Sequence, residues 1–544
     1  MTRYTSKHAA TGVALLLTIA VVQTRQDHSH HGDVLGTVNF DTSCSADAKP
    51  SFTRAVALLH SFGYEQARGT FEDVASRDPR CAMAQWGIAM TWWHPLWAPP
   101  TNAELTSGQR AAAKARAIGG GTPRERAYIE AIGLFYDGAD TKSHQVRATA
   151  YRDRVMRITT EFSDDVEASI FYALSLLVTA PPGDATFANQ KQAAEILNRV
   201  ATHQPDHPGI VHYLIHAFDY PRLAPEALPA ARAYAKIAPA SPHALHMPTH
   251  IFTRLGLWQE SIDANLASAQ SAREVVGRAH PGATSFDALH ALDYLVYAYL
   301  QIDDQEKARA AADEAASARR FDEPNFAAGY AIAAIPARYA LERRDWQAAS
   351  ALNVPAVELP WQQFPYALAT VHFARALGAA RIGQPTRARE AVETLRTIQQ
   401  QLTTNPVPGP YDWAGQVESM RLAASAWTSR AEGRNDEALT QARAAAELEE
   451  RVGKHPVTPG AVLPARELLG DLLLDLNRPD DAVRAFESSL TQAPNRFNSL
   501  AGAARAAGRA GQRDKAAEYY RTLLNQVNKD SRRPEVQEAR EFRQ

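Results

Sequence analysis

The sequence predicts an all-α protein in which pairs of antiparallel helices repeat and stack into a solenoid. The first observation is a period of 34 residues in the spacing of small, aromatic and proline residues. The second is a hydrophobic content of 45%, and the third is that the 32 prolines are spread along the chain, as expected between many short helices. A unit of this length forms two helices that cannot bury their apolar faces alone, so neighbouring units must stack. The repeating residues are Ala67, Phe71 and Pro79; Ala227 and Pro239; Ala482, Phe486 and Pro494; and Ala516 and Tyr520.

The N-terminus has the pattern of an export signal. Arg3 and Lys7 precede an uncharged run from Ala9 to Val22. This run is shorter than the roughly 20 residues of a membrane-spanning helix, and it matches the apolar region of a signal peptide. No clear small-x-small cleavage motif follows, so an uncleaved anchor stays an alternative. We therefore expect residues 1–26 to be a signal peptide or N-terminal anchor, and the protein to be exported, either periplasmic or extracellular, and membrane-bound only if this segment is retained.

If the protein is exported, its two cysteines, Cys44 and Cys81, can form a disulfide. Cys44 precedes the first expected helix and Cys81 follows its antiparallel partner, so both lie at the same end of a helical hairpin. An oxidising compartment permits a disulfide between them. Residues 27–47 are polar and read as a linker. Its His28, His30 and His31 are either a solvated cluster or a non-specific metal scavenger.

The 34-residue pattern resembles that of the tetratricopeptide repeat family. The strings DPRCAMAQWGIAM, HYLIHAFD, HMPTHIF and PNRFNSLAGAARAA also resemble exported bacterial proteins of this family whose function is undefined. The resemblance implies a superhelix of about nine or ten units between residue 48 and roughly residue 530. We expect four parts after the linker: an array with a histidine-rich groove at 48–322, divergent helical repeats at 323–462, a C-terminal repeat pair at 463–530, and a tail at 531–544.

Six histidines between residues 208 and 297 are the strongest functional signal. They occur at helical spacing on three successive expected helices, with two aspartates and a tyrosine in the same stripes. In tetratricopeptide repeats these stripe positions line the concave groove, so the resemblance implies that all of them face one groove. The histidines are His212, His216, His243, His246, His250 and His290; the accompanying residues are Asp219, Asp293 and Tyr297.

Three interpretations of this stripe remain open. Imidazoles on separate rigid helices can converge on a transition metal, with the aspartates as further ligands or as partners that orient the rings. The groove can instead bind an anionic peptide or small molecule, or the histidines can be surface residues that align by chance. We favour the metal, as zinc, copper or iron. Further groove candidates are His60, His94, Glu467 and Asp471. His455 lies on a long loop, which we expect either to pack against the core or to act as a lid.

Composition and motifs narrow the function. The net charge of −2 and the lack of a basic face argue against a nucleic-acid partner. The sequence contains no zinc-protease motif, no CxxC pair, no phosphate-binding glycine loop and no nucleophile elbow. The sequence therefore predicts an exported repeat protein with a metal in its groove, and whether it is an oxidoreductase, a hydrolase or no enzyme stays open. The alternative is a periplasmic scaffold that binds a protein or peptide in the groove.

Overall fold

The computed structural model describes residues 1–2, 34–96 and 99–542. Within them the chain is all-helical, with only a single isolated bridge between Thr284 and Phe321 and no strand. Apart from its first two residues, the expected signal peptide or anchor (1–26) lies outside the described residues, as do His28, His30 and His31. Among the helices that are described, none is both long and apolar enough to span a membrane.

Successive helices pack against one another in pairs, and each pair stacks on the next, as predicted for a solenoid. The pairs are α1 (Lys49–His60) and α2 (Tyr64–Arg77); α3 (Ala82–Thr91) and α4 (Asn102–Ile118); α5 (Pro123–Tyr136) and α6 (His144–Glu161); α7 (Val166–Val178) and α8 (Ala188–Ala201); α9 (Pro208–Phe218) and α10 (Ala224–Ile237); α11 (Pro242–His246) with α12 (Pro248–Arg254), and α13 (Trp258–Ala279); α14 (Phe286–Gln301) and α15 (Gln305–Ala316); α16 (Phe326–Glu342) and α17 (Trp346–Ser350); α18 (Pro365–Arg381) and α19 (Pro385–Thr404); α20 (Trp413–Ala431) and α21 (Asn435–Val452); α22 (Ala465–Asp475) and α23 (Pro479–Gln492); and α24 (Phe497–Arg509) and α25 (Arg513–Gln526).

The repeat period has a packing cause. The buried Phe71 ring lies against Gly87 so closely that a Cβ atom at that glycine would stand 2.4 Å from the ring. Phe486 lies in the same way against Gly470 and Gly502, where a Cβ would meet its ring at 2.8 and 2.3 Å. An aromatic residue on one helix and glycines on the neighbouring helices thus fit together, and this fit repeats because each unit presents the same face to the next.

The array covers the expected span but has more helical units than the sequence suggested. It contains more helix pairs than the expected nine or ten, and α16 to α21 continue the stacking without a break through 323–462. The expected tail at 531–544 contains helix α26 (Pro534–Phe542), which buries Val536 and Ala539 completely. A short amphipathic helix at the end of a solenoid covers the apolar face that the last unit would otherwise expose.

The expected polar linker is also wrong in its described part. Residues 34–47 run along the N-terminal units, and Leu35, Val38 and Phe40 are each only 5% exposed. The Thr37 N–H donates to the carbonyl oxygen of Asp206 at 3.0 Å. The three apolar side chains are the physical reason, because the array buries them. The predicted disulfide is confirmed: Cys44 is bonded to Cys81 and fixes this segment to the start of α3.

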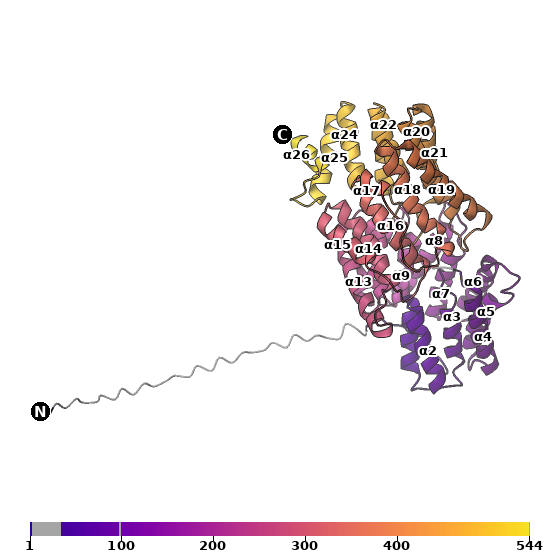
Figure 1. Cartoon of the computed structure of the whole chain (residues 1–544). Helices are drawn as coiled ribbons and strands as arrows, with labels where there is room; N and C mark the ends of the chain where they lie inside the picture. Colours follow the sequence, from indigo (N-terminus) through magenta and orange to yellow (C-terminus); the bar gives the residue numbers. More distant parts are fainter. Residues whose placement is uncertain (3–33, 97–98, 543–544) are drawn as a thin grey trace.

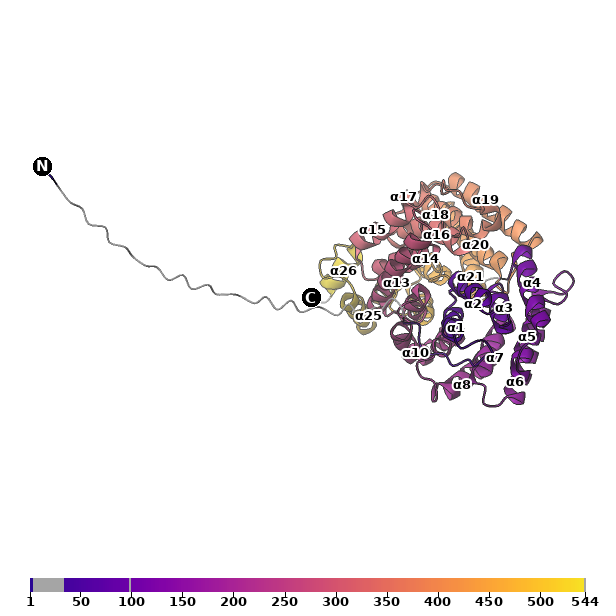
Figure 2. The same cartoon turned by 90° about the horizontal axis from the view of Figure 1, so that it is seen from below.

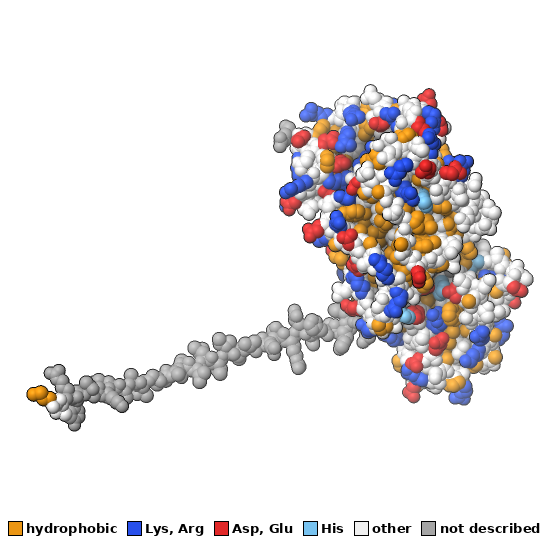
Figure 3. Space-filling view, viewed as in Figure 1, with side chains coloured by type: hydrophobic (Ala, Val, Ile, Leu, Met, Phe, Trp, Pro, Cys, Tyr) orange, Lys and Arg blue, Asp and Glu red, His pale blue; other side chains and the backbone are white. Residues whose placement is uncertain are grey.

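The solenoid turns back on itself. Figure 1 shows the helices winding from α2–α7 at one end to α22–α26 at the other, and Figure 2 shows them arranged around a common centre. The C-terminal units contact the middle of the array directly: the Trp258 indole N–H donates to the Asn495 carbonyl at 2.9 Å, and the Asn528 N–H donates to the Ile302 carbonyl at 2.9 Å. On the face in Figure 3, basic and acidic side chains intermingle around a central band of hydrophobic atoms.

Candidate metal centre

Four helices, α9, α11, α12 and α14, position the six histidines, and the local sequence fixes where they begin. His207 caps α9, Ser241 caps α11 and Ser285 caps α14, each accepting a backbone N–H of the first turn. Pro208 and Pro242 occupy the first helical position, where the missing N–H costs nothing. Pro248 cannot donate within the helix, and the chain is accordingly divided there into α11 and α12.

The structure gathers the histidines into two groups of three. We call His212, His216 and His243 the first triad, and His246, His250 and His290 the second triad. Within each triad, one potential ligand atom per residue lies within 4.8 Å of the others. Five of these side chains are at least 91% buried, and His216 is half-buried. The turned-back solenoid therefore encloses this part of the chain, so that little of the expected groove is exposed at the histidines.

In the first triad the ring nitrogens point at one another. The Nε2 atom of His212 lies 3.1 Å from Nε2 of His243 and 3.1 Å from Nε2 of His216. The Nδ1 atom of His212 lies 2.6 Å from the carbonyl oxygen of His60, which can only accept. Nδ1 therefore carries the hydrogen, and in the neutral ring Nε2 presents a lone pair to the two other Nε2 atoms.

The second triad repeats this arrangement more strictly. His246 Nδ1 donates to the side-chain oxygen of Asn265 at 2.8 Å. The NH2 group of Asn265 donates to the Ser261 carbonyl at 2.8 Å, which fixes the orientation of the amide. His250 Nδ1 donates to Asp219 at 3.2 Å. Both Nε2 atoms are thus lone-pair acceptors, yet they lie 3.1 Å apart with no hydrogen between them in the neutral state. The His290 ring completes the group at 4.2 Å from the His246 ring centre.

Protonation of the rings does not relieve this contact. Burial lowers the pKa of His246 well below its usual value of 6.5, and the neighbouring His250 and His243 rings lower it further. Burial also lowers the pKa of His250, although Asp219 opposes that effect. The same causes act on the first triad, where burial and then His216 lower the pKa of His212. Neutral imidazoles with converging lone pairs are the form in which histidine binds a metal ion.

A nearby histidine group lacks this property. His60 and His207 each contact a different oxygen of Glu167 through Nε2, both at 2.9 Å. The Nδ1 atom of His60 faces the Tyr213 hydroxyl at 2.9 Å, and Nδ1 of His207 accepts the Gly209 N–H. Every ring nitrogen of His60 and His207 therefore has a complementary hydrogen-bond partner, and no lone pairs face each other in this group. Burial opposes ionisation of Glu167, but His207 and His60 outweigh it and lower the pKa of this carboxyl.

This network corrects one prediction and reveals two residues that the sequence reasoning missed. His60 does not join the triads through its side chain, because that side chain faces Glu167; its backbone carbonyl orients His212 instead. Glu167 and His207 were missed because they lie on α7 and at the cap of α9, outside the groove positions. The cap position of His207, directly before a proline at the start of a helix, was the available signal.

Aromatic rings separate the first triad from His94. Phe62 has a left-handed backbone (φ 54°), an unusual conformation for a bulky residue, and its ring stacks on the rings of His216 and His243. Tyr64 stacks on Phe62 and contacts His94 at a ring separation of 4.8 Å. His94 therefore does not reach the triads, and its nearest carboxylate is Glu104 at 3.7 Å. Phe62, Tyr64, His94 and Glu104 are all partly exposed, as is His216. They therefore mark the side on which the first triad comes nearest to solvent.

Of the three accompanying residues, Asp219 is the one that forms a hydrogen bond with a triad histidine. It accepts from His250, from Arg254 at 2.9 Å and from Lys454 at 2.8 Å. Burial opposes its ionisation, but Lys454 and Arg254 outweigh that effect and lower the pKa of the Asp219 carboxyl. Asp219 thus holds the orientation of the His250 ring through this hydrogen bond.

Asp293 and Tyr297 take part in a different set of contacts. Asp293 pairs with the buried Arg338 at 3.1 Å, and the Tyr297 hydroxyl accepts from Arg496 at 3.1 Å. They do not contact the histidines, because on α14 they face the later units of the array rather than α11 and α12. Asp293 is therefore an unsuitable ligand, since its charge is already matched by Arg338.

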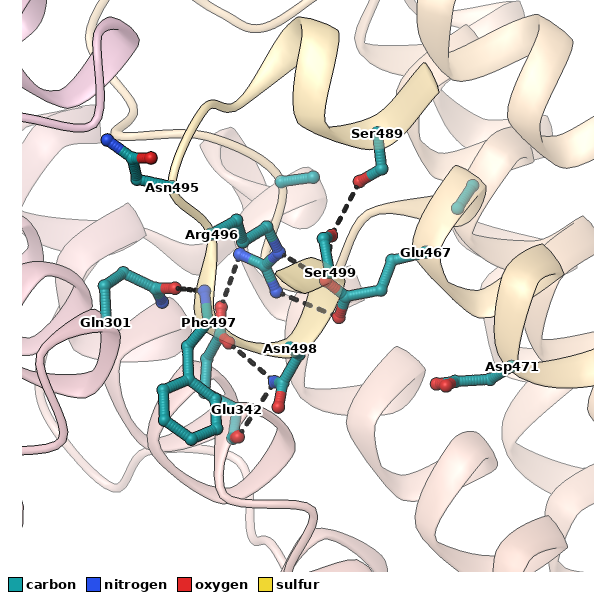
Figure 4. A network of polar contacts seen from close by, with 12 residues as sticks. Gln301, Glu342, Glu467, Asp471, Ser489, Asn495, Arg496, Phe497, Asn498 and Ser499 are labelled. Atoms are coloured by element: carbon teal, nitrogen blue, oxygen red, sulfur yellow. Dashed lines mark hydrogen bonds and ion pairs between the residues drawn. The ribbon is translucent and has the colours of Figure 1, made fainter. Parts of the chain in front are cut away.

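Glu467 and Asp471 also lie away from the histidines. Figure 4 shows Arg496 between Glu467 and Glu342, at 2.7 Å from each carboxylate, with the Ser499 hydroxyl donating to Glu467 at 2.6 Å. Burial opposes the charge on Glu467, but Arg496 outweighs it and lowers the pKa of that carboxyl. Asp471 pairs with Arg344 at 3.0 Å. These carboxylates join the C-terminal units to α16, so the expected continuation of the groove stripe is a structural ion-pair network.

The loop between α21 and α22, residues 453–464, lies against the second triad. The Tyr294 ring contacts all three histidines of that triad, and its hydroxyl lies 3.2 Å from the carbonyl oxygens of Val457 and Thr458. Lys454 reaches Asp219 from the same loop. His455 does not face the triads, because it stacks on Trp413. The sequence left open whether this loop packs into the core or covers the site. Its contacts do both: His455 packs on Trp413, and Val457 and Thr458 contact Tyr294 beside the second triad.

Comparisons with known proteins add little to this description. No protein-family model matches the chain, and a search of curated proteins finds no relative. Among solved structures, a chain from the crystal structure of the APC/C hetero-tetramer Cut9–Hcn1 aligns with 91% of this chain and 90% of its own length. The sequence identity is 12% and the TM-score is 0.33, which is too low to support an argument about function.

Proposed function

We propose that this protein binds transition-metal ions at the two histidine triads and acts as a metal-dependent enzyme. The observation that carries the proposal is the 3.1 Å contact between the Nε2 atoms of His246 and His250. Both rings already donate through Nδ1, so neither supplies a hydrogen to this contact. Two buried lone pairs that face each other repel, and within the part of the chain that the structure describes neither has a hydrogen-bond donor. A cation bound by both removes the repulsion.

The donor set suits zinc, copper or iron, because imidazole nitrogen binds all three. Three protein ligands leave coordination positions for water or substrate, as in catalytic rather than structural sites. A bound ion would supply Lewis acidity or, for copper and iron, electron transfer. The residues around it have separate tasks: Asn265, Asp219 and the His60 carbonyl hold the imidazole tautomers, and Tyr294 with the 453–464 loop excludes water.

Burial favours this proposal over a peptide-binding groove. A peptide must contact the residues that recognise it, and five of the six histidines are at least 91% buried. In the first triad, His216 is the one ring that is half-buried rather than buried. We also propose export to an oxidising compartment, which is supported by the Cys44–Cys81 disulfide, because such bonds are rare in reducing compartments.

Elemental analysis of the purified protein, expressed with zinc, copper and iron supplied, tests the proposal. The variant to compare is the triple replacement of His212, His246 and His250 by Ala, and the control is His203→Ala, which alters an exposed histidine. We expect metal in stoichiometric amount in the parent and the control and almost none in the triple variant. Parent protein without any of these metals would overturn the proposal, and equal metal in parent and triple variant would move the site elsewhere.

A further inference from the structure

We infer that the two triads form one dinuclear centre, in which each triad holds its own ion and the two ions lie close enough to interact. This inference rests on the proposed function and specifies the number and arrangement of the ions. It is drawn from the spacing of ring nitrogens within each triad and from the contacts between the triads.

Each triad has the dimensions of a site for one ion. Metal–imidazole bonds of about 2.0–2.1 Å place neighbouring nitrogens roughly 2.9–3.4 Å apart for ligand angles between octahedral and tetrahedral. The three Nε2–Nε2 contacts of 3.1 Å, two in the first triad and one in the second, lie in this range. The third ligand of the second triad, His290, lies with its ring 4.2 Å from that of His246. Since each triad is complete with three rings, six rings make two sites rather than one.

The two triads touch. The rings of His216, in the first triad, and His250, in the second, are 6.5 Å apart between centres. Helix α11 supplies a histidine to each triad, because His243 and His246 lie three residues apart on its short length. The two triads therefore adjoin, through the His216 and His250 rings and through α11.

The carboxylates near the triads are already paired with cationic side chains. Asp219 is the carboxylate that contacts a triad ring, and Lys454 and Arg254 also bind it. Asp293 is neutralised by Arg338. Carboxylate bridging between the ions is therefore not offered by these two side chains, and the six imidazoles are neutral ligands. The inferred centre accordingly has an all-nitrogen protein shell, a set that copper(II) binds more tightly than the other divalent first-row metals.

Copper(II) is the probe for the test, because a single ion is paramagnetic and a close pair is spin-coupled. The chain is stripped of metal, titrated with copper(II), and examined by elemental analysis and by electron paramagnetic resonance. We expect about two copper ions per chain at saturation, set by the two three-imidazole sites. The integrated spin signal should rise with the first equivalent and then fall short of the copper bound, with line broadening from the pair.

Single-site variants complete the test. His216→Ala should leave one ion in the second triad, and His290→Ala one ion in the first, each with a full and unbroadened spin signal. His203→Ala should behave as the parent. One copper per parent chain, or two with additive signals, would overturn the dinuclear inference but leave the proposed metal site intact. No bound copper would overturn both. The titration of the parent decides between these outcomes even if a variant fails to fold.

Discussion

The Nε2 atoms of His246 and His250 lie 3.1 Å apart, each on a ring whose Nδ1 atom already donates to a neighbour. An unpaired buried polar atom costs about 1–3 kcal/mol. A protein retains such an arrangement where something else, such as a cation, binds both atoms. The nearby His60–Glu167–His207 group, where each nitrogen has a complementary partner, shows that this chain also makes satisfied histidine networks.

Asn265→Ala should weaken metal binding without removing a ligand. The substitution deletes the oxygen that accepts from His246 Nδ1, so the ring loses the bond that holds its tautomer. Loss of such a partner behind the ligands typically lowers metal affinity about 10–100-fold. Competition with a chromophoric chelator measures the change. Asn265→Asp keeps an acceptor at this position and should retain most of the affinity; equal losses in both variants would contradict the assigned role.

The sequence was enough to predict the helices and to find the histidines, because both depend on local spacing. His212 and His216 share a helix face, and so do His243, His246 and His250. The sorting into two triads was not predictable, since it depends on how α9, α11, α12 and α14 meet. Burial of the site was also missed, because it depends on a loop more than 160 residues from His290 in the chain and on the turning of the whole array.

The repeat itself was predictable for a similar reason: Phe71 and Gly87 fit together within neighbouring helices. The contacts that close the solenoid join residues far apart, such as Arg496 and Glu342. No periodic pattern marks such pairs. For Glu467 the helical position alone suggested a groove residue, and only its buried partner Arg496 shows that it is structural.

Arg496→Ala should destabilise the contact between the C-terminal units and the middle of the array. It leaves Glu342 and Glu467 buried without their cation, and breaking a buried pair in this way costs about 3–5 kcal/mol. Denaturant unfolding followed by tryptophan fluorescence measures the loss. Arg484→Ala removes an exposed arginine from its pair with Asp481, and the unfolding free energy should change by no more than about 0.5 kcal/mol. Similar losses of unfolding free energy in both variants would show that the buried position of Arg496 does not make its ion pairs more important for stability.

Replacing Cys44 and Cys81 together by Ser should loosen the start of the chain. The disulfide closes a loop with a sequence separation of 37 residues, which corresponds to about 3–4 kcal/mol in the loop-entropy model. The effect should be largest locally, because the bond holds residues 34–47 against the first units. Limited proteolysis with mapping of the cleavage sites tests this: new cleavage between residues 34 and 60 is expected, and an unchanged pattern would contradict it.

Glu449 should make stability depend on pH. Burial raises the pKa of its carboxyl from 4.5 to about 7, although the Ala465 N–H that it accepts opposes the shift. A raised pKa in the folded state means that folding favours the protonated form. Its contribution is therefore complete below pH 4.5 and is lost as the pH rises through about 7. The unfolding free energy of the parent, relative to Glu449→Gln, should fall between about pH 4.5 and 7 and level off above that. A constant difference across this range would refute the prediction.

Tyr294→Phe should speed the release of one ion from the second triad. The ring that packs on His246, His250 and His290 remains, but the hydroxyl that binds the Val457 and Thr458 carbonyls is lost. Loss of roughly 1 kcal/mol of hydrogen bonding raises the opening rate of the 453–464 loop about fivefold. Stopped-flow transfer of metal to a chelator measures this rate.

The matched control is Tyr234→Phe, on the other side of the centre. The Tyr234 ring stacks on His212 of the first triad, and its hydroxyl donates to Ser61 rather than to the loop. Its loss should leave both release rates unchanged. If Tyr294→Phe also leaves them unchanged, the loop does not control access, and ions must leave past Phe62 and the half-buried His216, where the first triad comes nearest to solvent.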